Sequence, residues 1–220
     1  MKTAGIVLCG GRSARMGAPK AWLPFDGEFM LARVVRVVRE AVGPVVVVAA
    51  PGQDLPPLPA GTVTVRDEEE GQGPLAGLAA GLAALEGTTD AAYLSSCDAP
   101  FLRAAFVRRV VGSLSGGREA PVSLSAQGAH APRSVEPVAF ASVPRVNDRL
   151  HPLAAVYRVG VLPTVRAMLA ARRLRMTDLF DRVPTRVIGP DELSDADPEL
   201  VSLLNVNTPE EYEAARKSLS

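Results

Sequence analysis

The first residues whose types and spacing suit chemistry follow a short apolar run in the segment GIVLCGGRSARMGAPK. Gly10 and Gly11 end the apolar run, and the segment then carries three cations: Arg12, Arg15 and Lys20. Glycines let consecutive backbone N–H groups converge on an anion, and Arg and Lys add charge-assisted hydrogen bonds to phosphate oxygens. The spacing therefore predicts a polyphosphate cradle in which Arg15 and Lys20 contact the phosphates.

Two familiar phosphate-binding loops do not match this segment. A Walker loop needs G-x-x-x-x-G-K-[ST], whereas Gly11 and Gly17 are separated by five residues and no Lys follows. The dinucleotide fingerprint G-x-G-x-x-G is also missing from the GGRSAR stretch. The alternative to the cradle is a glycine-rich turn whose basic residues are only solvated.

A carboxylate follows a second expected strand, AAYLSS (91–96). Because ligands bind beyond the carboxyl ends of strands in an open α/β sheet, Asp98 should reach the same edge as the glycine loop. One carboxylate together with phosphate oxygens suits Mg²⁺, so Asp98 is the predicted metal ligand. The alternative is that Asp98 only caps the helix that begins near Pro100.

The elements that must position these residues alternate along the chain. The alternation predicts a Rossmann-like, three-layer α/β/α fold with a mostly parallel central sheet. The stretches VAFASV and LHPLAAVY predict a C-terminal β-hairpin extension, whereas residues 112–135 give no clear prediction. A single domain, 1–220, is expected. The expected strands are 4–8, 45–50, 62–65 and 91–96, and the expected helices are 29–42, 74–87, 101–114, 161–174 and one capped by Thr208.

Composition excludes several classes of function. Acids and bases balance at 24 each, so no global field attracts nucleic acid or a membrane surface. No apolar stretch approaches the roughly 20 residues that cross a bilayer, and the N-terminal run does not resemble a signal peptide. Cys9 and Cys97 lack metal-type spacing and are expected to be reduced packing thiols near each other at the strand ends. A cytoplasmic protein is the expectation.

Four sets of motifs together resemble the molybdopterin nucleotidyltransferases, over nearly the whole chain. The string LCGGRSARMGAPK is similar to the nucleotide signature of that family, and GPLAGL (73–78) is similar to its second nucleotide loop. The string SSCDAPF resembles the family's metal motif, and HPLAAVY and NVNTPEEY resemble its acceptor-side segments. GPLAGL favours the guanylyltransferase branch. Pro19 and Cys9 depart from the family pattern, which often has Asp and a small residue there.

The resemblance implies Mg²⁺-dependent transfer of GMP from GTP to the terminal phosphate of molybdopterin or Mo-molybdopterin, with release of pyrophosphate. It implies Arg15, Lys20 and Asp98 as catalytic residues, with Asp98 holding the metal. It also implies molybdenum cofactor insertion proteins or molybdoenzymes as partners. The implied nucleotide-binding residues are Leu8, Cys9, Gly10, Gly11, Lys20, Asp67, Gly73 and Asp98, and the implied acceptor-binding residues are His151, Asn205 and Asn207.

Alternatives remain open at this point. A cytidylyltransferase of the same superfamily would use CTP, and a non-catalytic adaptor would bind nucleotide without transferring it. Sugar-1-phosphate nucleotidyltransferases favour a Gly-x-Gly-Thr-Arg loop, which this segment lacks. Asp67 could contact the base or the ribose. Asn205 and Asn207 could bind the acceptor or only shape the turn, and Gly77 and Gly81 could serve helix packing alone.

Overall fold

A mixed β-sheet forms the middle layer of the fold. The computed structural model describes residues 1–10, 19–67, 72–115 and 138–218. The strands are β1 (Thr3–Leu8), β2 (Pro24–Phe25), β3 (Glu28–Phe29), β4 (Val45–Ala49), β5 (Val63–Arg66), β6 (Ala91–Ser96), β7 (Ala141–Val146), β8 (Arg149–Leu150), β9 (Ala154–Arg158) and β10 (Thr185–Ile188). The main sheet has the order β10-β7-β9-β6-β1-β4-β5, β8 pairs with β7, and β2 and β3 form a separate hairpin.

The strand directions agree with the predicted alternation. β1 pairs in parallel with both β4 and β6, and β4 pairs in parallel with β5. β9 is antiparallel to both β6 and β7, so the mostly parallel sheet and the later hairpin are both confirmed. β10 is parallel to β7 at the sheet edge and was not expected, because its four residues, TRVI, carry too little apolar pattern.

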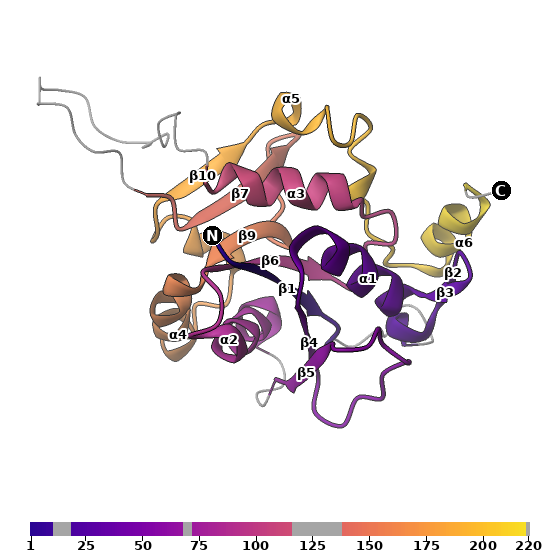
Figure 1. Ribbon diagram of the computed structural model, residues 1–220, viewed down its shortest axis with the longest axis horizontal. Helices are drawn as coiled ribbons and strands as arrows, with labels where there is room; N and C mark the ends of the chain where they lie inside the picture. The colour runs from indigo at the N-terminus through magenta and orange to yellow at the C-terminus, as the bar shows by residue number, and fades with distance from the viewer. Residues whose placement is uncertain (11–18, 68–71, 116–137, 219–220) are drawn as a thin grey trace, which may run out of the picture.

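Helices cover both faces of this sheet, so the predicted three layers are confirmed (Figure 1). α1 (Met30–Val42) and α3 (Ala104–Ser113) pack on one face. α2 (Gly73–Leu85) and α4 (Leu162–Ala170) pack on the other. α4 is shorter than the expected helix over 161–174. It ends because Arg172 adopts a left-handed conformation (φ 53°) and the Arg173 N–H donates back to the Met168 carbonyl.

Two glycines let α2 lie close on the sheet. A Cβ on Gly81 would stand 2.7 Å from Cγ2 of Ile6, and one on Gly77 would stand 2.9 Å from Cδ2 of Leu8. Both values are below the distance of an ordinary carbon–carbon contact, so side chains at these positions would push the helix outward. The packing interpretation of these glycines is therefore confirmed.

The remaining elements are short and lie toward the ends of the sheet. α6 (Pro209–Lys217) is capped by Thr208, as expected, and packs beside the β2–β3 hairpin (Figure 1). Within the described ranges, no helix combines the length and apolar character needed to cross a membrane. The other elements are α5 (Pro190–Leu193) and four 3₁₀ helices, Lys20–Trp22, Val159–Val161, Met176–Leu179 and Val201–Leu203.

Candidate active site

β1 and β6 end side by side at one edge of the sheet. In their parallel ladder Leu8 lies opposite Ser96, and the Cys97 N–H donates to the Leu8 carbonyl over 2.9 Å. The strand order also reverses here, since β4 and β5 lie beyond one side of β1 and β6 lies on the other. Open α/β sheets bind ligands at such a reversal. The expectation that the strand ends near residues 9 and 97 meet at one edge is confirmed.

Three side chains from distant parts of the sequence meet at this edge: Lys20, Asp98 and Asn207, here called the Lys20 cluster. The Lys20 Nζ donates to Asp98 Oδ2 over 2.8 Å and to Asn207 Oδ1 over 2.9 Å. The side chains of Lys20 and Asp98 are each only 15% exposed, so water screens their ion pair partially. The other Asp98 oxygen accepts a hydrogen bond from the Ser96 hydroxyl. An ammonium group can bind a phosphate, and oxygen atoms beside it can bind the metal cation that neutralises that phosphate.

The turn before α6 positions Asn207. The Val206 N–H donates to the Asp98 carbonyl over 2.8 Å, which ties this turn to the end of β6. The Glu211 carboxylate accepts from the N–H groups of Asn207 and Thr208, over 2.6 and 3.2 Å. Asn207 is therefore held by the capping box of α6 while its side chain reaches Lys20.

A small hydrophobic cluster, here called the satellite core, lies behind the Lys20 cluster. The rings of Phe25 and Phe101 meet edge to face with centroids 5.5 Å apart, and the Tyr212 hydroxyl donates to the Pro24 carbonyl. Lys20, Asp98 and Asn207 each lie within five residues of an apolar side chain of this core. The core is formed by Phe25, Met30, Val206, Tyr212 and Ala215, with Leu23 and Phe101 packed against it.

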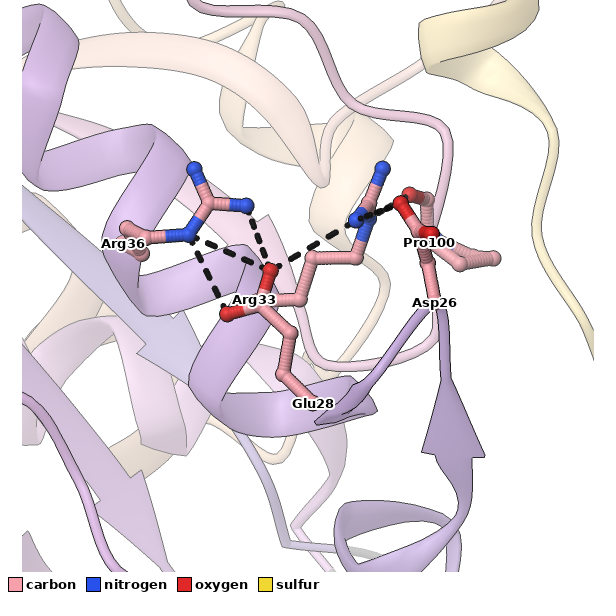
Figure 2. Close-up of polar contacts among 5 residues, drawn as sticks. All are labelled: Asp26, Glu28, Arg33, Arg36 and Pro100. Carbon is pink, nitrogen blue, oxygen red and sulfur yellow. Dashed lines mark hydrogen bonds and ion pairs between the residues drawn. The ribbon is translucent and has the colours of Figure 1, made fainter.

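Arg33 of α1 ties the turn after Asp98 to the β2–β3 hairpin (Figure 2). Its Nε donates to the Pro100 carbonyl over 2.8 Å, and its Nη1 lies 2.9 Å from Asp26 Oδ2. Glu28 accepts from both Arg33 and Arg36. This role could not be predicted, because a cation on the polar side of an amphipathic helix usually faces solvent.

Cys9 and Gly10 lie at the carboxyl end of β1, beside a loop after β4. The Cys9 N–H donates to the Val48 carbonyl over 2.8 Å, and the Cys9 carbonyl accepts from Gln53 Nε2 over 3.1 Å. A Cβ on Gly10 would stand 3.3 Å from the Ala50 nitrogen, so this position favours glycine. Gln53 was not predicted. The sequence feature that could have indicated it is a single amide side chain in the loop after a buried strand.

The other predicted nucleotide residues lie at different points along the same edge. The backbone N–H of Asp67, directly after β5, donates to the Ala49 carbonyl over 2.9 Å. Gly73 begins α2 with a left-handed backbone (φ 69°), and Leu8 is buried under that helix. Gly11 and Arg15 lie outside the described residues.

His151 and Asn205 line a cavity of about 140 Å³ beside the end of β6. Partial burial, followed by the charge of Arg149, lowers the pKa of His151, so its imidazole is neutral near pH 7. Asn207 does not line this cavity, because its side chain belongs to the Lys20 cluster. The structure thus divides the three predicted acceptor residues between two places. The other lining residues include Tyr93, Ser95, Arg149 and Ser202.

Known proteins resemble this chain over nearly all of its length. Residues 5–183 match the family model described as the MobA-like NTP transferase domain. The chain belongs to this family. A protein of Desulfosudis oleivorans named molybdenum cofactor guanylyltransferase is 30% identical over 216 residues, which cover 98% of this chain and 95% of that protein.

Solved structures with low sequence identity share the fold of this MobA-like chain. The molybdopterin-guanine dinucleotide biosynthesis protein A of Archaeoglobus fulgidus has a TM-score of 0.72 and 19% identity, covering 99% of this chain and 98% of that one. A Mycobacterium tuberculosis protein solved in complex with manganese has a TM-score of 0.61 and 18% identity, covering 99% and 100%. The chain is therefore a nucleotidyltransferase by its family, and it shares the fold of these structures.

The donors around Asp98 in this MobA-like chain fit a hard cation shared with a substrate. Among the described residues, no group of three His, Cys, Asp or Glu side chains gathers at one point. Asp98 instead offers one carboxylate, with the Ser96 hydroxyl beside it. Such a set lacks the ligands of a closed zinc site and resembles sites where substrate phosphates complete the coordination.

Proposed function

We propose that this chain transfers the GMP unit of GTP to the terminal phosphate of molybdopterin, or of Mo-molybdopterin, and releases pyrophosphate. The observation that carries the proposal is the Lys20 cluster, which gathers a cation, a carboxylate and an amide where β1 and β6 end. The name of the Desulfosudis relative supports both the guanine nucleotide and the molybdenum cofactor as substrates.

The proposal assigns two neighbouring sites to this edge. The nucleotide side consists of the Lys20 cluster, with Gly10 and Asp67 at the ends of β1 and β5. The acceptor side is the cavity that His151 and Asn205 line. Asn205 and Asn207 are two residues apart and belong to different sides, so the two sites are adjacent. Adjacent sites suit a reaction that must align two bound substrates.

In the proposed reaction, an oxygen of the acceptor phosphate attacks the α-phosphorus of GTP. The bond from this phosphorus to its bridging oxygen breaks, and pyrophosphate leaves with the electron pair. Phosphoryl chemistry of this kind depends on alignment and charge neutralisation more than on a proton shuttle. Lys20 would exchange its contact with Asp98 for a phosphate oxygen and keep Asn207 as its second partner. Arg15 is the proposed second phosphate contact.

Asp98 is the proposed ligand for Mg²⁺. Its Oδ2 is released when Lys20 turns to a phosphate, and the Ser96 hydroxyl then steadies the other carboxylate oxygen. When bound, the cation would supply neutralisation of the charge on the phosphate oxygens. The manganese complex of the Mycobacterium tuberculosis protein supports a divalent cation in this fold.

The remaining roles follow from position. Asp67 lies at the end of β5, where it is proposed to contact the guanine or the ribose of the nucleotide. Leu8, Cys9 and Gly73 are proposed to contribute through their backbones. His151 is proposed to offer the acceptor a neutral hydrogen-bonding group, because the lowered pKa of its imidazole disfavours the charged form.

Pyrophosphate release with a panel of nucleotides tests the proposal. We expect release only when GTP, Mo-molybdopterin and Mg²⁺ are all present, and none with Asp98→Asn, a variant of the same size that removes the charge. A preference for CTP would identify a cytidylyltransferase instead. Tight GTP binding without release, for every acceptor form, would overturn the enzymatic proposal in favour of an adaptor.

A further inference from the structure

Cys9 and Cys97 directly follow two neighbouring parallel strands, β1 and β6. The register of these strands ends with Leu8 opposite Ser96, so the two cysteines leave the ladder from matching positions. The hydrogen bond from the Cys97 N–H to the Leu8 carbonyl, 2.9 Å long, continues the ladder to this point. Adjacent strands lie about 4.8 Å apart, which is within the range of Cα separations that a disulfide can span.

Both side chains also point to the same face of the sheet. Cys9 follows β1 two residues after Val7, and Cys97 follows β6 four residues after Tyr93. All four pack in the hydrophobic cluster under α1 and α3. The cysteines are 5% and 7% exposed, and both are free thiols. The register and the shared face therefore place two reduced sulfurs beside each other.

The contacts of the Cys9 sulfur favour it as the attacking thiol. Gln53 Nε2 lies 3.3 Å from the Cys9 Sγ. Hydrogen bonding with the Cys97 thiol, the Gln53 amide and the charge of Arg66 lower the pKa of Cys9 against the opposing effect of burial. Cys9 is thus the proposed nucleophile, and Cys97 is the neighbouring thiol that can resolve it.

We propose that Cys9 and Cys97 are a redox-modification site, which a small hydroperoxide converts into an intramolecular disulfide. The Cys9 thiolate attacks one peroxide oxygen, the O–O bond breaks, and hydroxide leaves, so that Cys9 becomes a sulfenic acid. The Cys97 sulfur then attacks the Cys9 sulfur and expels the hydroxyl group, which leaves as water with the Cys97 proton. In total, two thiols and one hydrogen peroxide give one disulfide and two waters. A thiol reductant reverses the modification.

The position of this pair links its redox state to nucleotide binding. Cys9 is bonded to Gly10 of the glycine loop, and Cys97 is bonded to Asp98 of the Lys20 cluster. Closing the sulfurs to a bond of about 2.05 Å draws both peptide segments together. It also removes the Sγ contact of Gln53, the same amide that holds the Cys9 carbonyl. We expect the oxidised protein to bind GTP about tenfold more weakly, the loss of one good hydrogen bond.

The first test is mass spectrometry of the full-length folded protein after treatment with hydrogen peroxide. We expect a loss of about 2 Da, the two thiol hydrogens, a cross-linked peptide pair containing Cys9 and Cys97, and reversal by dithiothreitol. A Cys97→Ser variant should instead add oxygen at Cys9 and show no loss of mass. Unreacted thiols in the native wild-type protein, or stable oxygen adducts without a cross-link, would overturn the proposal.

The second test measures GTP binding by calorimetry before and after oxidation. Each protein is compared with its own reduced form, because Cys9 lies within the proposed nucleotide site. The wild-type protein should lose affinity reversibly, whereas Cys9→Ser, which can form neither a sulfenic acid at this position nor the disulfide, should bind GTP equally before and after peroxide treatment. A cross-linked wild-type protein with unchanged affinity would refute the link to nucleotide binding. The disulfide itself is detected by mass, so this inference can fail or succeed independently of the transfer reaction.

Discussion

Replacing Asn207 with Ala should weaken GTP binding although Asn207 was expected to contact the acceptor. In the structure its Oδ1 accepts a hydrogen bond from Lys20 Nζ over 2.9 Å, and it does not line the acceptor cavity. Lys20 retains Asp98 as its only partner in the Lys20 cluster after this substitution. The ammonium group is then pulled toward the carboxylate and away from the phosphate that it is proposed to bind.

The magnitude follows from the exposure of this contact. A hydrogen bond to a charged group contributes about 1.5–3 kcal/mol when shielded, but Asn207 is an exposed residue. Solvent screening reduces the expected loss to about 1 kcal/mol, or about fivefold in the GTP dissociation constant. The assay is calorimetric titration with GTP, followed by pyrophosphate release at varied GTP and at varied Mo-molybdopterin.

Asn205→Ala is the matched control, since it removes the same side chain two residues away. Asn205 lines the cavity with His151, so this variant should raise the KM for the acceptor and leave GTP affinity unchanged. The reasoning is wrong if Asn207→Ala raises only the acceptor KM, or if both variants give the same kinetic pattern.

Three further predictions concern packing, positioning and pH. Gly81→Ala should destabilise the fold by about 1–2 kcal/mol in chemical denaturation, because overpacking against β1 outweighs the gain in helix propensity. Gly112→Ala, where an added Cβ meets nothing within 4 Å, should stabilise it by up to about 1 kcal/mol. Arg33→Ala should lower kcat by up to about tenfold, because the turn at Pro100 loses the hydrogen bond to its carbonyl. Arg33→Lys should recover part of this activity, and the circular dichroism spectrum should be unchanged in both variants. Burial and a nearby cation lower the pKa of His151 in the folded protein, so the unfolded chain binds more protons than the folded one. The free energy of unfolding should therefore fall as the pH drops below 6.5, the ordinary pKa of histidine. That part of the pH dependence should be missing in His151→Gln.

The elements nearest the sheet centre could be predicted because their patterns are strong and local. A fully buried parallel strand such as VVVVA reads as a continuous apolar run, and α1 shows one apolar face. Ligands bind beyond the carboxyl ends of the strands in an open α/β sheet, and this rule was enough to place Gly10 and Asp98 at the same edge. The prediction was weakest where elements are short, as at β10 and the β2–β3 hairpin.

The contact between Lys20 and Asn207 could not be predicted in the same way. The two residues are 187 positions apart, and an Asn two residues before a helix has a sufficient local reason to be there. Gln53 and Arg33 could be predicted no better, because the contact by which each holds the end of a strand or turn in the site is made to a backbone carbonyl. A backbone carbonyl has no residue type, so the sequence holds no trace of the pairing.

The satellite core explains how such distant residues come to share one site. It joins the hairpin after Lys20, the turn after Asp98 and the helix after Asn207, through Phe25, Phe101 and Tyr212. Because hydrophobic burial has no directional preference, it can draw three segments together without fixing which polar groups meet. The hydrogen bond from the Val206 N–H to the Asp98 carbonyl orients the turn before α6 relative to the end of β6. The chain thus separates the force that assembles the site from the contacts that orient it.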